Sequence, residues 1–176
     1  FPKKRVMGMA GILDTARFKS FLAEEMKVSV KSISAYVLGG HGDTMVPVIK
    51  STTIGGVLAS ELISSKRLEE IVQRTRDGGA EIVGLLKTGS AYYAPSAAIV
   101  QMVESILFDS NEILPCAALL ENEYEINGLF VGIPIKIGKS GIEEIIEIEL
   151  SESEQEALKH SANSVKELTE IMYKND

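Results

Sequence analysis

Three side chains in the first quarter of the sequence could transfer a proton and bind an anion. Asp14 and Arg17 are three residues apart, a spacing that places both on one face of a helix. His41 lies between Gly40 and Gly42, and glycines let the backbone turn sharply and a ligand approach closely. An imidazole there could exchange a proton near neutral pH, and a guanidinium can bind a carboxylate through two parallel hydrogen bonds. From spacing alone, a surface ion pair and a turn histidine without function remain alternatives.

The other residues that commonly carry chemistry indicate no second site. Cys116 follows a proline and precedes an apolar run, which is typical of an inert buried thiol. With two histidines and one cysteine, the chain lacks a Cys/His zinc pattern, so no metal site is expected. His160 lies among Glu, Lys and Ser residues and is expected to face solvent. The sequence contains no Gly-x-Gly-x-x-Gly, P-loop or Gly-x-Ser-x-Gly motif.

Composition and charge narrow the class of protein. The 176 residues are 45% hydrophobic and 24% charged, which is typical of a globular chain with a core of its own. A net charge of −7 opposes binding to a phosphate backbone, and no apolar run is long enough to span a bilayer, so neither nucleic acid nor membrane is an expected partner. A single cysteine excludes an internal disulfide and favours a reducing, cytoplasmic location. Because the sequence begins with Phe1 rather than Met, we interpret it as part of a longer protein.

Four segments have the apolar spacing of helices, and their residues are 13–26, 68–86, 95–108 and 151–173. The last of them begins at a capping box, in which Ser151 and Glu154 would each bind the other's backbone N–H. Within the second helix, the adjacent glycines Gly78 and Gly79 predict a kink or two abutting helices.

Short β-rich segments separate the predicted helices. They are residues 33–38, two strands within 46–60 joined at Gly55–Gly56, and strands over 129–137 and 146–150 that form a hairpin through 138–141. Strands and helices occur in runs and do not alternate strictly. The pattern therefore indicates an α+β fold in which antiparallel sheets pack with long helices, and residues 1–176 form a single domain.

Four motifs, taken together, resemble one known family. They are GMAGILDTARF at residues 8–18, GGHGDTMVP at 39–47, GSAYYAP at 89–95 and GLFVG at 128–132. They resemble the C-terminal, substrate-binding half of NAD-dependent malate dehydrogenases of the lactate-dehydrogenase-like type. The first two motifs are long, ordered and correctly spaced from each other, so the resemblance outweighs the alternatives that spacing alone left open.

The resemblance implies an activity and a role for each site residue. The activity is the reversible, NAD-dependent oxidation of (S)-malate to oxaloacetate, a step of the tricarboxylic acid cycle. His41 would be the acid/base, Asp14 would fix its tautomer and stabilise the imidazolium, and Arg17 would hold the substrate carboxylate. Ala91 and Pro95 would lie near the nicotinamide and the substrate side chain.

An L-lactate dehydrogenase is the closest alternative that the resemblance allows. Lactate dehydrogenases usually carry a threonine where Ala91 stands, and a Gly-Glu-His sequence where this chain has Gly39-Gly40-His41. Both differences favour malate as the substrate.

The resemblance also implies that much of the family's site lies outside these residues. The glycine-rich NAD fingerprint, the acidic residue for the ribose and the substrate-selecting loop belong to an N-terminal Rossmann domain, which this chain lacks. Hydride transfer needs cofactor and substrate at near-attack distance, so we expect the chain alone to be inactive. In isolation it would then be a non-catalytic assembly module. The family forms homo-oligomers, dimers or tetramers, and helices 13–26 and 68–86 are expected to expose apolar patches to a partner subunit.

Overall fold

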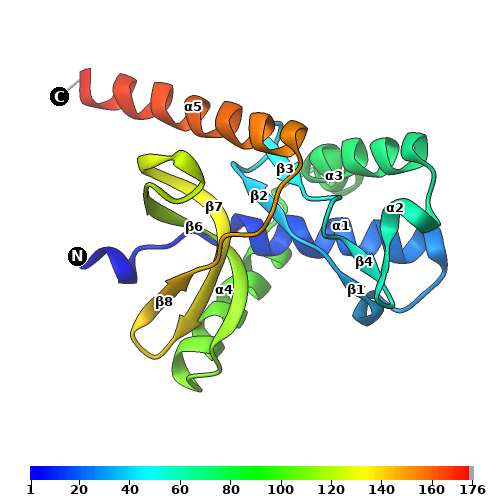
Figure 1. Cartoon of the computed structure of the whole chain (residues 1–176), viewed down its shortest axis with the longest axis horizontal. Coiled ribbons are helices and arrows are strands. Elements are labelled where there is room, and N and C mark those ends of the chain that lie inside the picture. The colour runs from blue at the N-terminus through cyan, green and yellow to red at the C-terminus, as the bar shows by residue number, and fades with distance from the viewer. Residues whose placement is uncertain (175–176) are drawn as a thin grey trace.

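A long helix, α1 (Ala10–Met26), packs against both of the antiparallel sheets of the protein (Figure 1). The architecture is that of a computed structural model, which describes residues 1–174. Three short 3-10 helices, η1 (Lys3–Arg5), η2 (Val30–Ser32) and η3 (Glu123–Glu125), lie in the connections. The predicted α+β fold with antiparallel sheets and long helices is confirmed.

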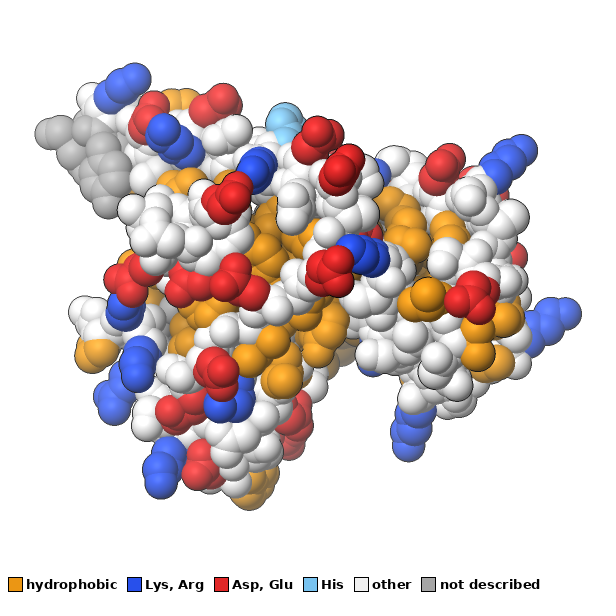
Figure 2. All heavy atoms as spheres, in the orientation of Figure 1, with side chains coloured by type: hydrophobic (Ala, Val, Ile, Leu, Met, Phe, Trp, Pro, Cys, Tyr) orange, Lys and Arg blue, Asp and Glu red, His pale blue; other side chains and the backbone are white. Residues whose placement is uncertain are grey.

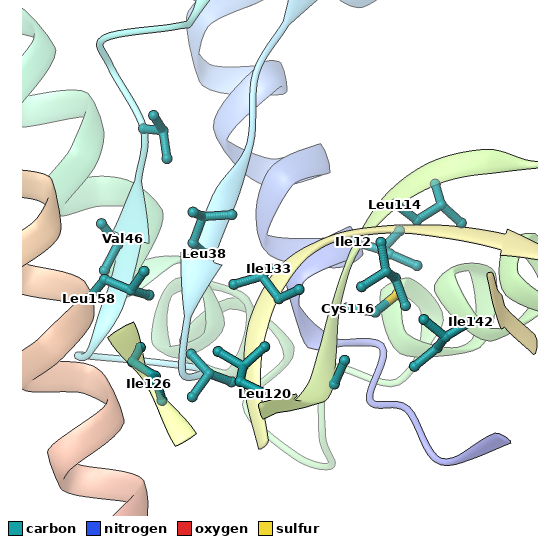
Figure 3. Packing of buried hydrophobic residues seen from close by; sticks show 14 of the residues in the cluster. Ile12, Leu38, Val46, Leu114, Cys116, Leu120, Ile126, Ile133, Ile142 and Leu158 are labelled. Atoms are coloured by element: carbon teal, nitrogen blue, oxygen red, sulfur yellow. The ribbon is translucent and has the colours of Figure 1, made fainter. Parts of the chain in front are cut away.

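The larger sheet has five strands in the order β3-β2-β7-β6, and β8 also pairs with β7. These strands are β2 (Val37–Gly39), β3 (Met45–Pro47), β6 (Glu112–Glu121), β7 (Asn127–Gly138) and β8 (Gly141–Ile145). Side chains of β6 and β7 are buried against α1, β2 and the last helix; Cys116, Ile133 and Leu158 are among those that meet in this core (Figure 3). Burial raises the pKa of the Cys116 thiol to about 12, as suits the inert role predicted for it.

The smaller sheet consists of β1 (Ile33–Ser34), β4 (Thr53–Ile54) and β5 (Val57–Leu58), in the order β1-β4-β5. It encloses a second core with α1, α2 (Ala59–Leu62) and α3 (Ser65–Leu86). Because α1 places Ile12 and Leu13 in the first core and Phe18 and Leu22 in the second, the residues between them lie where the two cores meet.

Two further helices cover the larger sheet. Helix α4 (Tyr93–Leu107) packs on β7, and α5 (Glu152–Lys174) packs on β7, β3 and β2. The predicted capping box is present at the start of α5: the Ser151 N–H donates to Glu154 Oε2 at 2.8 Å, and the Glu154 N–H donates to Ser151 Oγ at 3.3 Å. Within residues 1–174, no helix combines the length and the apolar character that a membrane span requires.

Several predicted strands differ from the observed ones. Residues 33–38 form two strands in different sheets, because the chain crosses from the small sheet to the large one between β1 and β2. Strand β6 was not expected. The hairpin through 138–141 is present, but its second strand is β8 and not residues 146–150, which form an extended connection to α5.

Helix α3 is also unlike its prediction, since it continues without a break through Gly78 and Gly79. Glycine lowers helix stability without bending the helix by itself, and here Gly78 is buried against a neighbouring side chain.

The expected apolar patches occur on only one of the two helices named for them. No large hydrophobic side chain of α1 is exposed, because α1 is surrounded by β6, α3, α4 and β2. Helix α3 does expose Val83, Leu85 and Leu86. Charged side chains of both signs are spread over the face of the molecule in Figure 2, and hydrophobic side chains gather in the middle of that face.

Candidate functional site

A buried carboxylate, Asp14, joins the two other side chains that the sequence singles out. It is 1% exposed. Its Oδ2 lies 2.8 Å from Nδ1 of His41, and its Oδ1 accepts a hydrogen bond from Nη1 of Arg17 at 3.1 Å. The structure thus brings the three residues into one hydrogen-bonded set, although 27 residues separate Asp14 from His41 in the sequence.

Helix α1 is fixed to the strand that leads to the histidine. The residue after Asp14, Thr15, is buried, and its Oγ1 accepts a hydrogen bond of 2.9 Å from the N–H of Val37 at the start of β2. This hydrogen bond therefore joins the helix that carries Asp14 to the strand that leads to His41.

The loop that carries His41 is anchored by the last helix. Strand β2 ends at Gly39, whose φ of +79° favours glycine. The Gly40 N–H donates to Oγ of Ser161 on α5 at 2.7 Å, and Ser161 is 0% exposed. A Cβ on Gly39 would lie 2.8 Å from the same oxygen. Ser161 is not among the predicted site residues, because nothing in its helical surroundings marks it.

A second contact ties α5 to the chain beyond β3. Oε1 of Glu154 accepts hydrogen bonds from the N–H groups of Ile49 and Lys50, at 2.7 and 3.1 Å. The carboxylate of the capping box thus has two tasks, since it starts α5 and also holds this helix against the segment that follows the His41 loop.

His41 combines a fixed nitrogen with access to solvent. Nδ1 is engaged by Asp14, while the side chain as a whole is 53% exposed. The hydrogen bond with Asp14 raises the pKa of His41 above its ordinary value, and partial burial and the charge of Arg17 act in the opposite direction. With Nδ1 bound to the carboxylate, Nε2 is the ring nitrogen left to meet a ligand.

Asp14→Asn should lower the pKa of His41, because it removes the group that raises this pKa and leaves burial and Arg17, which lower it. With the raised pKa, the imidazolium stabilises the fold fully below the unfolded histidine pKa of about 6.5, and this contribution is lost as the pH rises through the folded value. In Asp14→Asn this pH-dependent stabilisation should disappear. The measurement is an NMR titration of the two histidines, together with unfolding at several pH values.

Asp43→Asn is the matched control for this titration. Asp43 is an exposed carboxylate two residues from His41, and it is not among the groups that shift the pKa of the histidine. If both variants move the His41 pKa alike, the effect comes from net charge and the specific role of Asp14 is wrong.

The remaining predicted site residues, Ala91 and Pro95, take no part in the hydrogen bonds of this set. Ala91 is in the loop before α4 and Pro95 is in the first turn of that helix, and both are partly exposed. Neither side chain carries a polar group, so neither can join the set except by packing.

The family model for the lactate/malate dehydrogenase, alpha/beta C-terminal domain, matches residues 12–175. The chain belongs to this dehydrogenase family. A malate dehydrogenase of Chlorobium phaeobacteroides is 56% identical over 165 residues, which are 94% of this chain and 53% of that protein. The chain therefore spans about half the length of the malate dehydrogenases that it matches.

Solved structures of the same dehydrogenase family have the same fold. The malate dehydrogenase of Salinibacter ruber is 50% identical with a TM-score of 0.94, and the match covers 100% of this chain and 59% of that one. The lactate dehydrogenase of Cryptosporidium parvum, solved with lactic acid and nicotinamide adenine dinucleotide, is 42% identical with a TM-score of 0.95, over 97% of this chain and 56% of that one. Malate and lactate dehydrogenases thus share this domain.

Proposed function

We propose that this chain is the substrate-binding and proton-transferring domain of a malate dehydrogenase, which interconverts (S)-malate and oxaloacetate with NAD. The observation that carries the proposal is the hydrogen-bonded set of Arg17, Asp14 and His41, in which a carboxylate holds an imidazole and a guanidinium together. The identity of 56% to a malate dehydrogenase supports malate over lactate as the substrate.

His41 is the acid/base of the proposed reaction. In the direction of malate oxidation, its Nε2 takes the hydroxyl proton as the C–H bond of the same carbon breaks, and in the reverse direction the imidazolium returns the proton to the oxygen of oxaloacetate. NAD, when bound, supplies the acceptor for the hydride. Asp14 accepts the hydrogen bond from Nδ1–H, so it keeps Nε2 free of its proton before the reaction and stabilises the cation afterwards.

Arg17 binds and orients the substrate through its C1 carboxylate. Its side chain is only 10% exposed, and within residues 1–174 its hydrogen bond to Asp14 is the one that the structure gives. A guanidinium has five N–H donors, so a pair of parallel bonds to a carboxylate remains available. The bond to Asp14 holds the guanidinium close to the imidazole, as a 2-hydroxy acid requires.

The described residues fit the substrate but not the whole of NAD. Their sheets are antiparallel, and residues 1–174 contain no glycine-rich turn that leads from a parallel strand into a helix and could hold a pyrophosphate. We therefore assign the dinucleotide to a separate Rossmann domain, with residues 1–176 as the single substrate domain. Ala91 and Pro95, before and within the first turn of α4, would adjoin the nicotinamide end.

Exposed apolar side chains support the proposed contacts of this domain with other parts of the enzyme. Helix α4 exposes Ile99, Val100 and Val103, and α3 exposes the patch near its end. Such faces suit contact with the Rossmann domain or with a second subunit of a cytoplasmic homo-oligomer.

The test compares oxaloacetate and pyruvate as substrates of a full-length protein that contains this chain, with NADH oxidation as the signal. We expect kcat/KM for oxaloacetate to be higher by about 10²-fold or more. A preference for pyruvate would indicate a lactate dehydrogenase, and no oxidation with either substrate would contradict the proposal. Residues 1–176 alone are expected to give no turnover, and saturable NADH binding by them at micromolar concentration would refute the assignment of the cofactor to another domain.

A further inference from the structure

The side chain of Arg17 crosses α3 at a glycine. The buried residues of α3 are Leu68, Ile71, Thr75 and Gly78, which form its inward-facing stripe. At the last of these positions no side chain fills the space between α3 and α1. The stem of Arg17 occupies it instead, because a Cβ atom on Gly78 would overlap Arg17 Cδ and would lie 3.0 Å from Nε and 3.3 Å from Cγ.

The neighbouring glycine has no such contact. A Cβ on Gly79 would meet no atom within 4 Å. A glycine inside a helix makes the helix less stable than an alanine would. At Gly79 no close contact requires the absence of a side chain. Gly78 differs, since a methyl group there would push the middle of the Arg17 side chain, and with it the guanidinium, away from its present place.

The place of the guanidinium matters for two contacts. Nη1 of Arg17 donates to Asp14 Oδ1 at 3.1 Å, and the other oxygen of this carboxylate binds His41. A shift of Arg17 would therefore loosen one end of the hydrogen-bonded set and would move the donors that face the substrate. A bidentate bond to a carboxylate depends strongly on such placement.

We infer that Gly78 is a positioning residue for substrate binding. Because it has no side chain, it leaves the space in which the Arg17 stem lies, and this fixes the position of the Arg17 guanidinium. The inference rests on the proposed role of Arg17 in binding the substrate carboxylate. It gives a role to Gly78, a buried residue of α3 that carries no functional group.

The experiment measures KM and kcat for oxaloacetate in a full-length protein that contains this chain, with saturating NADH. Gly78→Ala should raise KM by about tenfold or more, because a charged hydrogen bond to the substrate is weakened, while kcat changes less. Gly79→Ala is the matched control, and its KM should stay that of the parent. Equal KM values for the two variants would overturn the inference.

Arg17→Lys separates this inference from the proposed function. If Arg17→Lys raises KM and Gly78→Ala does not, only the role of Gly78 is wrong. If Arg17→Lys leaves KM unchanged, the proposed substrate contact is itself wrong.

A second measurement keeps the inference testable if Gly78→Ala folds poorly. Arg17→Ala removes the atoms that the new methyl group would overlap, so Gly78→Ala should lower the unfolding temperature much less in the Arg17→Ala background than in the parent. The isolated chain and the full-length protein can both be used for this comparison. An equal loss of stability in both backgrounds would show that the methyl group disturbs something other than Arg17, and the inference would fail.

Discussion

His41→Asn is expected to lower kcat for oxaloacetate reduction by about 10²- to 10⁴-fold, the usual contribution of a general acid/base. Asparagine is smaller than histidine, but its amide nitrogen is attached to Cγ as Nδ1 is, so it can still donate to Asp14. It cannot exchange a proton near neutral pH, so the reacting oxygen would have to take its proton from water. The measurement is steady-state turnover of a full-length protein that contains this chain, with malate and with oxaloacetate.

The other histidine provides the control for this variant. His160 is exposed on α5, so His160→Asn makes the same chemical change outside the site. We expect its kcat to match that of the parent. If His41→Asn turned over as fast as His160→Asn, His41 would not be the acid/base. A lower unfolding temperature for His41→Asn alone would point to a structural cause for lost turnover.

Arg17→Lys is expected to reduce kcat/KM for oxaloacetate by about 10- to 100-fold, mostly through a higher KM. Lysine keeps the positive charge but lacks the planar fork, so at most one of two parallel hydrogen bonds to the substrate carboxylate survives. Each hydrogen bond to a charged group contributes about 1.5–3 kcal/mol. The shorter reach of lysine also weakens the contact with Asp14, which is buried and depends on its partners.

Arg67→Lys is the matched control for the arginine. Arg67 also bonds to carboxylates, those of Glu25 and Glu70, but its side chain is 46% exposed on the surface of α3. Exposed ion pairs contribute little, so this variant should keep the parent KM and stability. If the KM of Arg17→Lys equalled that of the parent protein, Arg17 would not be a substrate-binding residue.

Much of the fold follows from local patterns, and the failures have identifiable physical causes. Helix α5 was predicted from its capping box because the interaction is local. Strand β6 was missed because it contains Pro115 and two alanines, and because its central residues are apolar on both faces, which hides the alternation of a half-buried strand. Residues 146–150 alternate regularly, yet Leu150 and its neighbours pack as a single extended connection, which leaves the sheet after Ile146 N–H has donated to the Pro134 carbonyl.

The site divides in the same way. The spacing of Asp14 and Arg17 predicted a shared helix face, which the structure has, but spacing could not place His41 next to them, and only the resemblance to a family suggested it. The supports of the site were not predictable. Ser161 acts through contacts more than a hundred residues away in sequence, and Gly78 through the absence of an atom. The glycine pair was noticed, but as a kink, because a sequence shows that a side chain is missing and not what fills its place.

The attachment of the histidine loop to α5 has a consequence for how the protein is made. Gly40 and Ser161 are 121 residues apart in the sequence, and Ile49 and Glu154 are 105 residues apart. A chain that emerges from the ribosome can form α1, which carries Asp14 and Arg17, long before Glu154 and Ser161 have been synthesised. Contacts of such sequence separation form late, since the intervening chain must first be ordered. We therefore expect the loop that carries His41 to take its final position late in folding, so that incompletely folded molecules contain Asp14, Arg17 and His41 without the arrangement of the folded protein.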